Sequence, residues 1–350
     1  MYNIHMTKFD EYIEGSKKIL LITSQPVDPD CISSGLVMKK YLEHLGLNVT
    51  FRFPKELTQE EVDRNSYMPL FNEFIHSDTR TLLTEGDFDT LILLDGINWV
   101  QFYDYKNKEL PEPVLDKGKK IIQIDHHLGN PEDLATNQIK NNKASSTIEI
   151  ILSEVVPNDF LNKDLATLTY IGLMGDTGNF RWNFNPTTLR QAAMLLDKGV
   201  NPTEAIEHMF FMKKKEYMDM VKYVLENMEY DDELKTVFLF LPQAKLQADG
   251  IGEHRYRLIK EAFINEISFS IKGYTIGIFM AEETTKGKIK ISARGSNLNN
   301  KLSLPGFFKA LGGNGGGHFH ASGMEIDCDF EEFKSKMKHV LLEKFREIKF

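Results

Sequence analysis

The sequence predicts an α/β fold, in which an N-terminal domain with a mainly parallel sheet flanked by helices precedes a smaller C-terminal α/β domain. In the first half of the chain, short β-branched apolar runs alternate with amphipathic stretches, as in strands joined by helical crossovers. A long helical region follows, and a strand pattern returns near residue 232. The length of 350 residues also favours two domains.

Four strands and several helices are expected in the first domain. Three short apolar runs and a fourth that follows a predicted helix favour strands over residues 17–24, 89–96, 119–127 and 47–53. The helix is predicted over 33–46, because apolar residues recur there at helical spacing and Gly46 ends the pattern. Residues 145–230 are helical in pattern and end in a long amphipathic stretch.

The second domain is expected to contain strands over residues 236–242, 266–273, 274–283 and 287–295 and to close with a helix. The change from helical to strand pattern predicts a domain boundary near residue 231.

Composition narrows the class of protein. A net charge of −9 argues against a general basic surface for long nucleic acid, whereas a small anionic substrate remains compatible. With neither a basic-then-apolar start nor a long apolar run, the sequence predicts a cytoplasmic protein without membrane contact. Cys31 and Cys328 are too few and too far apart for a disulfide framework or a thiolate metal site. The amphipathic helices could bury a partner copy, so a homodimer stays open beside an intramolecular core.

Acidic residues and a histidine follow the predicted strands. Asp28 and Asp30 lie two positions apart after the first apolar run, and Asp95 and His126 end the next two. Asp176 lies between glycines that permit close backbone approach. Ligands of open parallel sheets bind beyond the carboxyl ends of the strands, and four acids with one histidine make up the ligand set of a two-metal hydrolytic site. Each acid alone could equally be a helix cap or turn residue.

A glycine cluster, LGGNGGGHFHASG (311–323), is the last motif. A helix-like stretch precedes it and a strand-like stretch follows, so its successive N–H groups could converge on an anion rather than form a plain flexible loop. Arg294 ends the preceding strand and could pair with a phosphate, although a surface arginine is the alternative.

Taken together, these motifs resemble those of the DHH/DHHA1 phosphoesterases, and the resemblance spans nearly the whole chain in the expected order. The matching stretches are VDPDCISSG, LILLDG, IDHH, LMGDTGNFRW, SARGS and GGNGGGHFHASG. The two-domain layout looks most like the nano-RNase (oligoribonuclease) and phosphoadenosine-phosphatase branch of that family.

The resemblance implies a catalytic metal-binding domain over 1–212, a linker helix over 213–231 and a substrate-binding domain over 232–350. It also implies a two-metal Mn²⁺ centre in the first domain. Asp28 and Asp95 would hold one Mn²⁺, and a second would be held by Asp30, Asp95, His126 and Asp176, with Asp95 as the bridge. His127 would face the scissile phosphate or the attacking water, and Asp125 would orient the histidines. The phosphate or terminal nucleotide of the substrate would be bound by Arg294, Gly315, Gly316, Gly317 and His318.

The sequence departs from the family at Ser24, where a histidine is usual. A serine hydroxyl is a poorer ligand for a transition metal than imidazole, so the first metal site should be weaker. Three consequences stay open: a preference for harder cations such as Mg²⁺, metal binding only with substrate present, or loss of catalysis. The implied function is hydrolysis of short RNA or DNA oligonucleotides or linear dinucleotides such as pApA to 5′-mononucleotides, with 3′-phosphoadenosine 5′-phosphate (pAp) as a further candidate. A catalytically weakened nucleotide-binding protein and a pyrophosphate or polyphosphate hydrolase are the alternatives.

Overall fold

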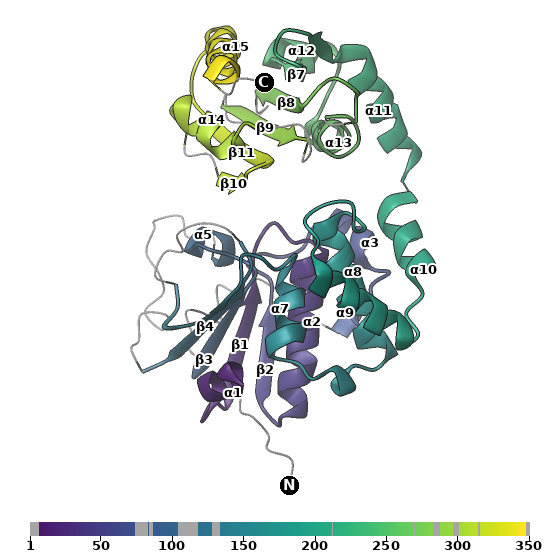
Figure 1. Cartoon of the computed structure of the whole chain (residues 1–350), viewed down its shortest axis with the longest axis vertical. Coiled ribbons are helices and arrows are strands. Elements are labelled where there is room, and N and C mark those ends of the chain that lie inside the picture. The colour runs from purple at the N-terminus through teal and green to yellow at the C-terminus, as the bar shows by residue number, and fades with distance from the viewer. Residues whose placement is uncertain are drawn as a thin grey trace. The chain divides into compact units, whose positions relative to one another are not determined.

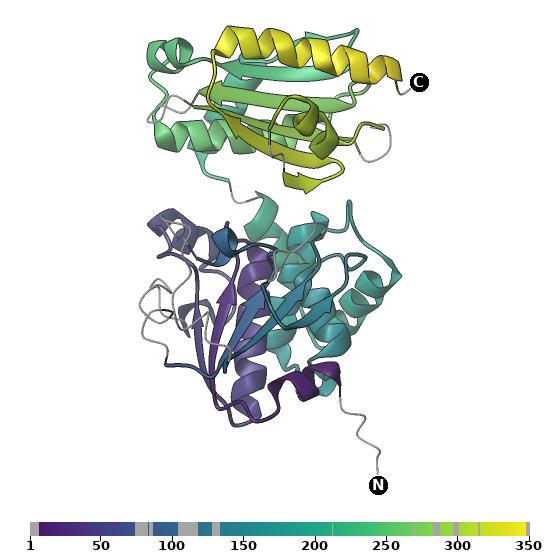
Figure 2. The ribbon, with the colours of Figure 1, turned by 90° about the vertical axis from the view of Figure 1, so that its left-hand side faces the viewer.

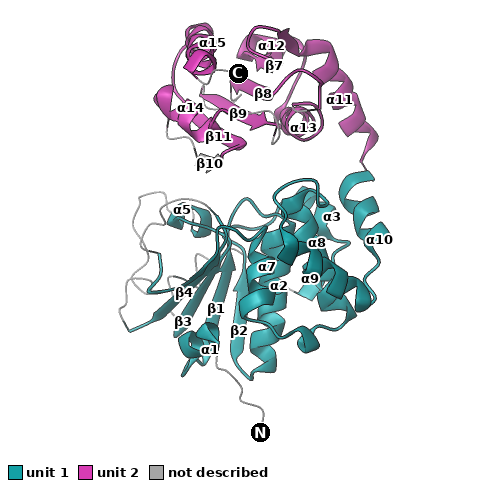
Figure 3. Ribbon diagram, viewed as in Figure 1, with its two compact units in different colours: residues 1–211 teal, residues 212–350 magenta. Residues whose placement is uncertain are grey.

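The computed structural model describes residues 7–73, 83, 87–103, 118–127, 134–211, 213–268, 270–282, 288–296, 301–313 and 316–347. The chain divides into two compact units, residues 1–211 and residues 212–350 (Figure 3).

The first unit is built on a parallel sheet of five strands in the order β2-β1-β3-β4-β5 (Figure 1). The strands are β1 (Lys18–Thr23), β2 (Asn48–Arg52), β3 (Thr90–Leu94), β4 (Lys120–Asp125) and β5 (Asn137–Lys140). All five residues of β3 are buried, as expected for a central parallel strand covered on both faces. The predicted fold class is confirmed, and β5 is an additional strand outside the predicted ones.

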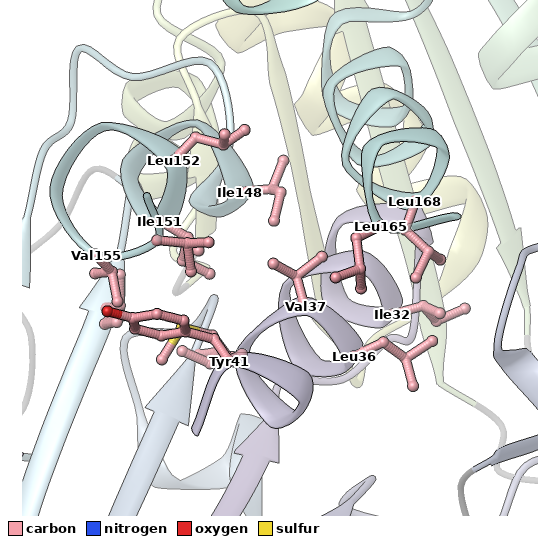
Figure 4. Close-up of a cluster of buried hydrophobic side chains, with 14 of the residues drawn as sticks. Ile32, Leu36, Val37, Tyr41, Ile148, Ile151, Leu152, Val155, Leu165 and Leu168 are labelled. Atoms are coloured by element: carbon pink, nitrogen blue, oxygen red, sulfur yellow. The ribbon is translucent and has the colours of Figure 1, made fainter. Parts of the chain in front are cut away.

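Helices cover both faces of this sheet. On one face, α2 (Pro29–His44) packs against α7 (Thr147–Glu154) and α8 (Lys163–Thr177), with apolar side chains from all three helices in one core (Figure 4). A second core on the other face includes Trp99 and Phe102 of α5 (Trp99–Phe102). The other helical segments described in this unit are α1 (Lys8–Ile13), α3 (Gln59–Asn65), η1 (Phe71–Glu73), η2 (Asn158–Phe160), α9 (Pro186–Asp197), α10 (Pro202–Ile206) and the π-helix η3 (Glu207–Phe211).

Helix α2 begins earlier than the sequence predicts. The predicted start was residue 33, but the helix begins at Pro29, and Asp28 caps it by accepting a hydrogen bond from the backbone N–H of Cys31. Proline at the first helical position and aspartate before it are favourable. The two acids of the DPD stretch therefore belong to a helix start rather than to a loop.

The second unit contains a mixed sheet in the order β10-β11-β9-β8-β7-β6. Its strands are β6 (Glu229–Asp231), β7 (Thr236–Leu241), β8 (Ile276–Glu282), β9 (Ile289–Gly295), β10 (Gly316–His318) and β11 (Ala321–Ile326). Among the strand pairs described in this sheet, β7 and β8 are parallel and the other pairs are antiparallel. One face carries α14 (Leu304–Ala310) and α15 (Phe330–Glu347), and α15 runs along the sheet (Figure 2). The other face carries α11 (Lys215–Asn227), α12 (Gln243–Ala248) and α13 (Glu253–Ala262).

The strand predicted over residues 266–273 is wrong. Helix α13 continues into the π-helix η4 (Phe263–Ile267), and the hydroxyl of Ser268 donates to the carbonyl oxygen of Ile264. Phe263 and Ile264 are buried in the core beneath β8. Within the stretch, Ile267 ends the π-helix and packs partly buried against the same core. The alternation of apolar and polar residues in EISFSIKG nevertheless fits the two-residue period of a strand.

The predicted linker, residues 213–231, contains α11 and β6. Tyr217, Met220 and Val224 of α11 are buried with residues of β7 and β8, so this helix contributes to the core of the second unit. Within the described part of the chain, no helix combines the length and apolar character needed to cross a bilayer. The expected cytoplasmic location and homodimer stay predictions.

Candidate metal centre

Asp95 occupies a left-handed backbone conformation directly after β3, with φ of 68°. This conformation costs a non-glycine residue about 1–3 kcal/mol, and such costs concentrate at functional sites. The carboxylate is almost completely buried. One oxygen accepts from Thr147 Oγ1 at 2.8 Å and the other from Cys31 Sγ at 3.1 Å. The strained turn thus aims Asp95 at the starts of α7 and α2.

Asp30, in the first turn of α2, is fully buried and ties two helices together. Its carboxylate accepts from the backbone N–H groups of Thr147 and Ile148 at 2.7 and 3.0 Å, and from Ser34 Oγ at 3.2 Å. The start of a helix supplies a positive dipole end that favours this negative charge. Asp30 therefore anchors α7 on α2 as well as facing the acidic cluster, a role that the sequence analysis missed.

His126 and Asp176 meet from opposite parts of the chain. His126 follows β4, Asp176 lies in the last turn of α8, and His126 Nε2 lies 3.1 Å from Asp176 Oδ2. The same nitrogen lies 3.5 Å from Asp95 Oδ1. The side chain of His126 is 4% exposed, whereas that of Asp176 is 21% exposed. The pair therefore reaches from the buried cluster toward solvent.

Two glycines of α8 allow the approach that places Asp176 here. A Cβ on Gly172 would lie 2.9 Å from Ser33 Cβ, and one on Gly175 would lie 3.1 Å from Pro29 Cβ. Side chains at these positions would push α8 away from α2. Glycines near Asp176 therefore allow α8 to approach α2 closely.

His127 has a different environment from His126. Its Nδ1 lies 2.8 Å from Asp125 Oδ1, and its backbone N–H donates to the same oxygen. The other carboxylate oxygen of Asp125 lies 3.2 Å from Lys140 Nζ on β5. The side chain of His127 is 28% exposed, compared with 4% for His126. Asp125 therefore orients His127, the more accessible of the two rings.

Among the residues that the structure describes, three groups of side chains could each hold a cation, because in each group the ligand atoms lie within 4.8 Å of one another. The groups are Asp95 with His126 and His127, Asp30 with His126 and Asp176, and Asp28 with Cys31 and Asp95. The five side chains that the resemblance implies as metal ligands thus converge on one region of the first unit. Cys31 was not among the predicted ligands. Two distant cysteines argue against a site made of thiolates alone, but one cysteine can still combine with carboxylates from other parts of the fold.

The electrostatics fit a site for divalent cations. Burial and the neighbouring Asp176 carboxylate raise the pKa of Asp28 to about 6. Burial and the charges of the other carboxylates also raise the pKa values of Asp30 and Asp95 well above their ordinary range. Burial alone would lower the pKa of His126, but Asp176, Asp95 and Asp30 raise it to about 10. Carboxylates packed this closely repel one another, and a divalent cation would relieve that repulsion.

The predicted substrate residues lie in the second unit. Arg294, on β9, pairs in register with Ala321 of β11, and Ala321 pairs with His318 of β10. Arg294 is half-buried, and burial of its guanidinium group away from water lowers its pKa. Gly316 and Gly317 also belong to β10, whereas Gly315 lies outside the described residues. The sheet thus places the backbone of this glycine-rich stretch two strands from Arg294.

Comparison with known proteins agrees with this layout. Residues 18–173 match the model of the DHH family, N-terminal domain, and residues 263–343 match that of the DHHA1 domain. A membrane protein–large ribosomal subunit bL9 fusion protein from onion yellows phytoplasma is 26% identical over 300 residues, or 81% of this chain and 32% of that protein. The bifunctional oligoribonuclease and PAP phosphatase NrnA of Thermus thermophilus is 28% identical over 232 residues, or 63% of this chain and 64% of that protein. The chain thus spans less than two thirds of the length of both relatives.

Solved structures share the fold. An exopolyphosphatase-related protein from Bacteroides fragilis superposes with a TM-score of 0.80 at 24% identity, over 97% of this chain and 96% of that chain. RecJ from Thermus thermophilus, solved in complex with Mn²⁺, gives a TM-score of 0.55 at 15% identity, over 95% of this chain and 53% of that chain. At these identities, the likeness concerns the fold.

Proposed function

The chain belongs to the DHH/DHHA1 family, and from this premise we propose that it is a metal-dependent phosphoesterase. Its proposed substrates are short oligonucleotides or linear dinucleotides such as pApA, which it hydrolyses to 5′-mononucleotides. pAp is a further candidate substrate. The observation that carries the proposal is the convergence of four aspartates and His126 beyond the strand ends of a parallel sheet.

The chain's own residues would divide the work. Asp28 and Asp95 would hold one divalent cation, and Asp30, Asp95, His126 and Asp176 would hold a second. Such a pair activates water as a nucleophile and offsets the negative charge of the phosphoryl group. Mn²⁺ is the expected ion at the second position, because that donor set combines carboxylates with an imidazole.

His127 is the proposed proton carrier. If Nδ1 donates to Asp125, then Nε2 of the neutral ring is an acceptor that could take a proton from the attacking water. The ion pair with Lys140 would help to hold the Asp125 carboxylate in place. In the second unit, Arg294 and the backbone of the glycine-rich strand would bind the phosphate or the terminal nucleotide, since a guanidinium can form a bidentate pair with phosphate.

A substrate panel tests the proposal. Metal-stripped protein resupplied with Mn²⁺ or Mg²⁺ is incubated with pApA, pAp or pyrophosphate, and the products are separated by chromatography. AMP release from pApA that disappears in Asp95→Asn supports the proposal. Phosphate release from pyrophosphate alone would favour the pyrophosphate or polyphosphate hydrolase. Binding of pApA without turnover under either metal would favour a nucleotide-binding protein.

A further inference from the structure

The thiol of Cys31 is completely buried inside the candidate metal centre. Its sulfur lies 3.1 Å from Asp95 Oδ2 and 3.5 Å from the hydroxyl oxygen of Ser24. Cys31 is therefore next to the position at which the sequence lacks the expected imidazole.

Three ligand atoms come together at this point. The sulfur of Cys31, a carboxylate oxygen of Asp28 and a carboxylate oxygen of Asp95 lie within 4.8 Å of one another. The start of α2 fixes two of them, because the cap bond from the Cys31 N–H to Asp28 holds these residues together. The left-handed turn at Asp95 supplies the third from another strand. Asp95 also belongs to the group with His126 and His127, so this trio is continuous with the rest of the centre.

We propose that Cys31 is a metal ligand, and that Asp28, Cys31 and Asp95 form a site for a borderline divalent cation such as Zn²⁺, Co²⁺ or Fe²⁺. The inference rests on the proposed metal centre, but it assigns a ligand that the implied metal set does not contain. When the cation binds, the S–H bond breaks, the sulfur–metal bond forms and the proton leaves to solvent. Metal binding therefore releases one proton from this residue.

The sulfur changes the expected metal preference. The absence of an imidazole at Ser24 alone would favour a harder cation such as Mg²⁺, because hydroxyl and carboxylate oxygens suit hard ions. A thiolate instead favours softer cations. The structure therefore favours a Zn²⁺-type ion at this position, in contrast to the Mg²⁺ preference expected from the sequence.

Cobalt spectroscopy on the full chain tests the proposal without measuring enzyme activity. Metal-free protein is titrated with Co²⁺, and the near-ultraviolet charge-transfer band of a thiolate–cobalt bond is recorded together with bound cobalt. Wild-type protein is expected to show the band, and Cys31→Ala and Cys31→Ser are expected to lose it. Cys328→Ser is the matched control, because the chain has only two cysteines and Cys328 lies in the second unit.

Competition with Zn²⁺ gives a second readout. Removal of a group that only supports a ligand costs about 10–100-fold in metal affinity, so Cys31→Ser should weaken Zn²⁺ binding by at least that factor. Its Mn²⁺ binding should change much less. Since serine is similar in size and can still donate to Asp95, a thermal melt that matches wild type would separate ligand loss from misfolding.

The outcomes separate this inference from the proposed function. Cobalt bound by wild type without a charge-transfer band would overturn Cys31 as a ligand and leave the carboxylate–histidine centre intact. Failure of the wild-type protein to bind any cobalt, zinc or manganese would overturn both. A band that persists in Cys31→Ala but disappears in Cys328→Ser would also contradict the assignment.

Discussion

Asp95 is the single residue that combines most of the properties of the candidate metal centre. It takes part in two of the three candidate ligand groups, it adopts a left-handed backbone, and it receives hydrogen bonds from Thr147 and Cys31. Its burial beside other carboxylates raises its pKa, so its ionised form is disfavoured while no cation is bound. Asp95 therefore links backbone strain, charge repulsion and the proposed metal binding.

Replacement of Asp95 by asparagine should separate metal binding from folding. Asparagine tolerates left-handed φ and removes one repelling charge, so the melting temperature of metal-free Asp95→Asn should equal or exceed that of metal-free wild type. The rise in melting temperature on adding Mn²⁺ should be lost, because a cation stabilises the folded state only when the folded protein binds it. Asp197→Asn, at an exposed position of the same unit, is the control. An equal Mn²⁺ response in wild type and Asp95→Asn would contradict this account.

The raised pKa of Asp28 predicts a pH dependence for the metal-free protein. The pKa rises from an ordinary 3.8 to about 6 in the folded state, so the folded chain holds this proton more tightly than the unfolded chain does. The associated stability is fully present below about pH 4 and is lost as the pH rises through 6. Relative to Asp28→Asn, the free energy of unfolding of metal-free wild type should therefore fall across this window. Urea titrations at several pH values measure the difference, and a flat or rising difference would be inconsistent with the assigned shift.

At the scale of elements, the core strands could be predicted but several connections could not. Runs such as 89–96 and 119–127 contain β3 and β4, because central parallel strands are continuous apolar segments. The strand β5 was missed, because NQIK is short and mostly polar. The stretch 266–273 was wrongly predicted as a strand, because its short run of alternating apolar and polar residues fits a strand as well as the end of a helix.

The candidate site could be predicted from the sequence only in part. Acids and histidines at strand ends were predictable, since parallel strands bring their carboxyl ends to one edge. The part played by Thr147 was not, because it depends on α7 meeting Asp30 and Asp95 from a distant part of the chain. Cys31 was hidden for the same reason, since its neighbour Asp95 is 64 residues away.

Close packing of α8 on α2 predicts a penalty at Gly172. An added Cβ would lie 2.9 Å from Ser33 Cβ and 3.0 Å from Ile148 Cγ2. Gly172→Ala should therefore lower the free energy of unfolding by about 1–3 kcal/mol, the usual range for an overpacked core, and should weaken metal binding by displacing Asp176. Gly306→Ala is the contrast, since this helical glycine is exposed and its added Cβ would lie 3.3 Å or more from any neighbour. Urea unfolding of both variants checks the sign, and equal stability of Gly172→Ala and wild type would refute the packing argument.

At the scale of the whole molecule, the proposed metal ligands all lie between residues 28 and 176, within the first unit. The second unit holds Arg294 and the glycine-rich strand in a sheet with its own cores. In the proposed function, cation binding and substrate-phosphate binding therefore belong to separate compact units. Added metal should therefore affect the first unit and leave the second unit unchanged.

Hydrogen exchange on the full chain should reveal the division. Added Mn²⁺ should slow amide exchange at the start of α2, at the start of α7 and at the end of α8, where the carboxylates are held. Exchange in α13 and α15 should stay unchanged. Asp95→Asn should abolish the protection. Equal slowing in both units would contradict a metal centre confined to the first.

The most direct test of the central claim is the initial rate of AMP release from pApA as a function of Mn²⁺ bound per chain. Metal-stripped wild type should be inactive, its rate should rise with bound Mn²⁺, and Asp95→Asn should remain inactive throughout. That result would join the carboxylate–histidine cluster to phosphoester hydrolysis. A rate that is independent of bound metal, or no AMP release from folded, metal-loaded protein, would contradict the account.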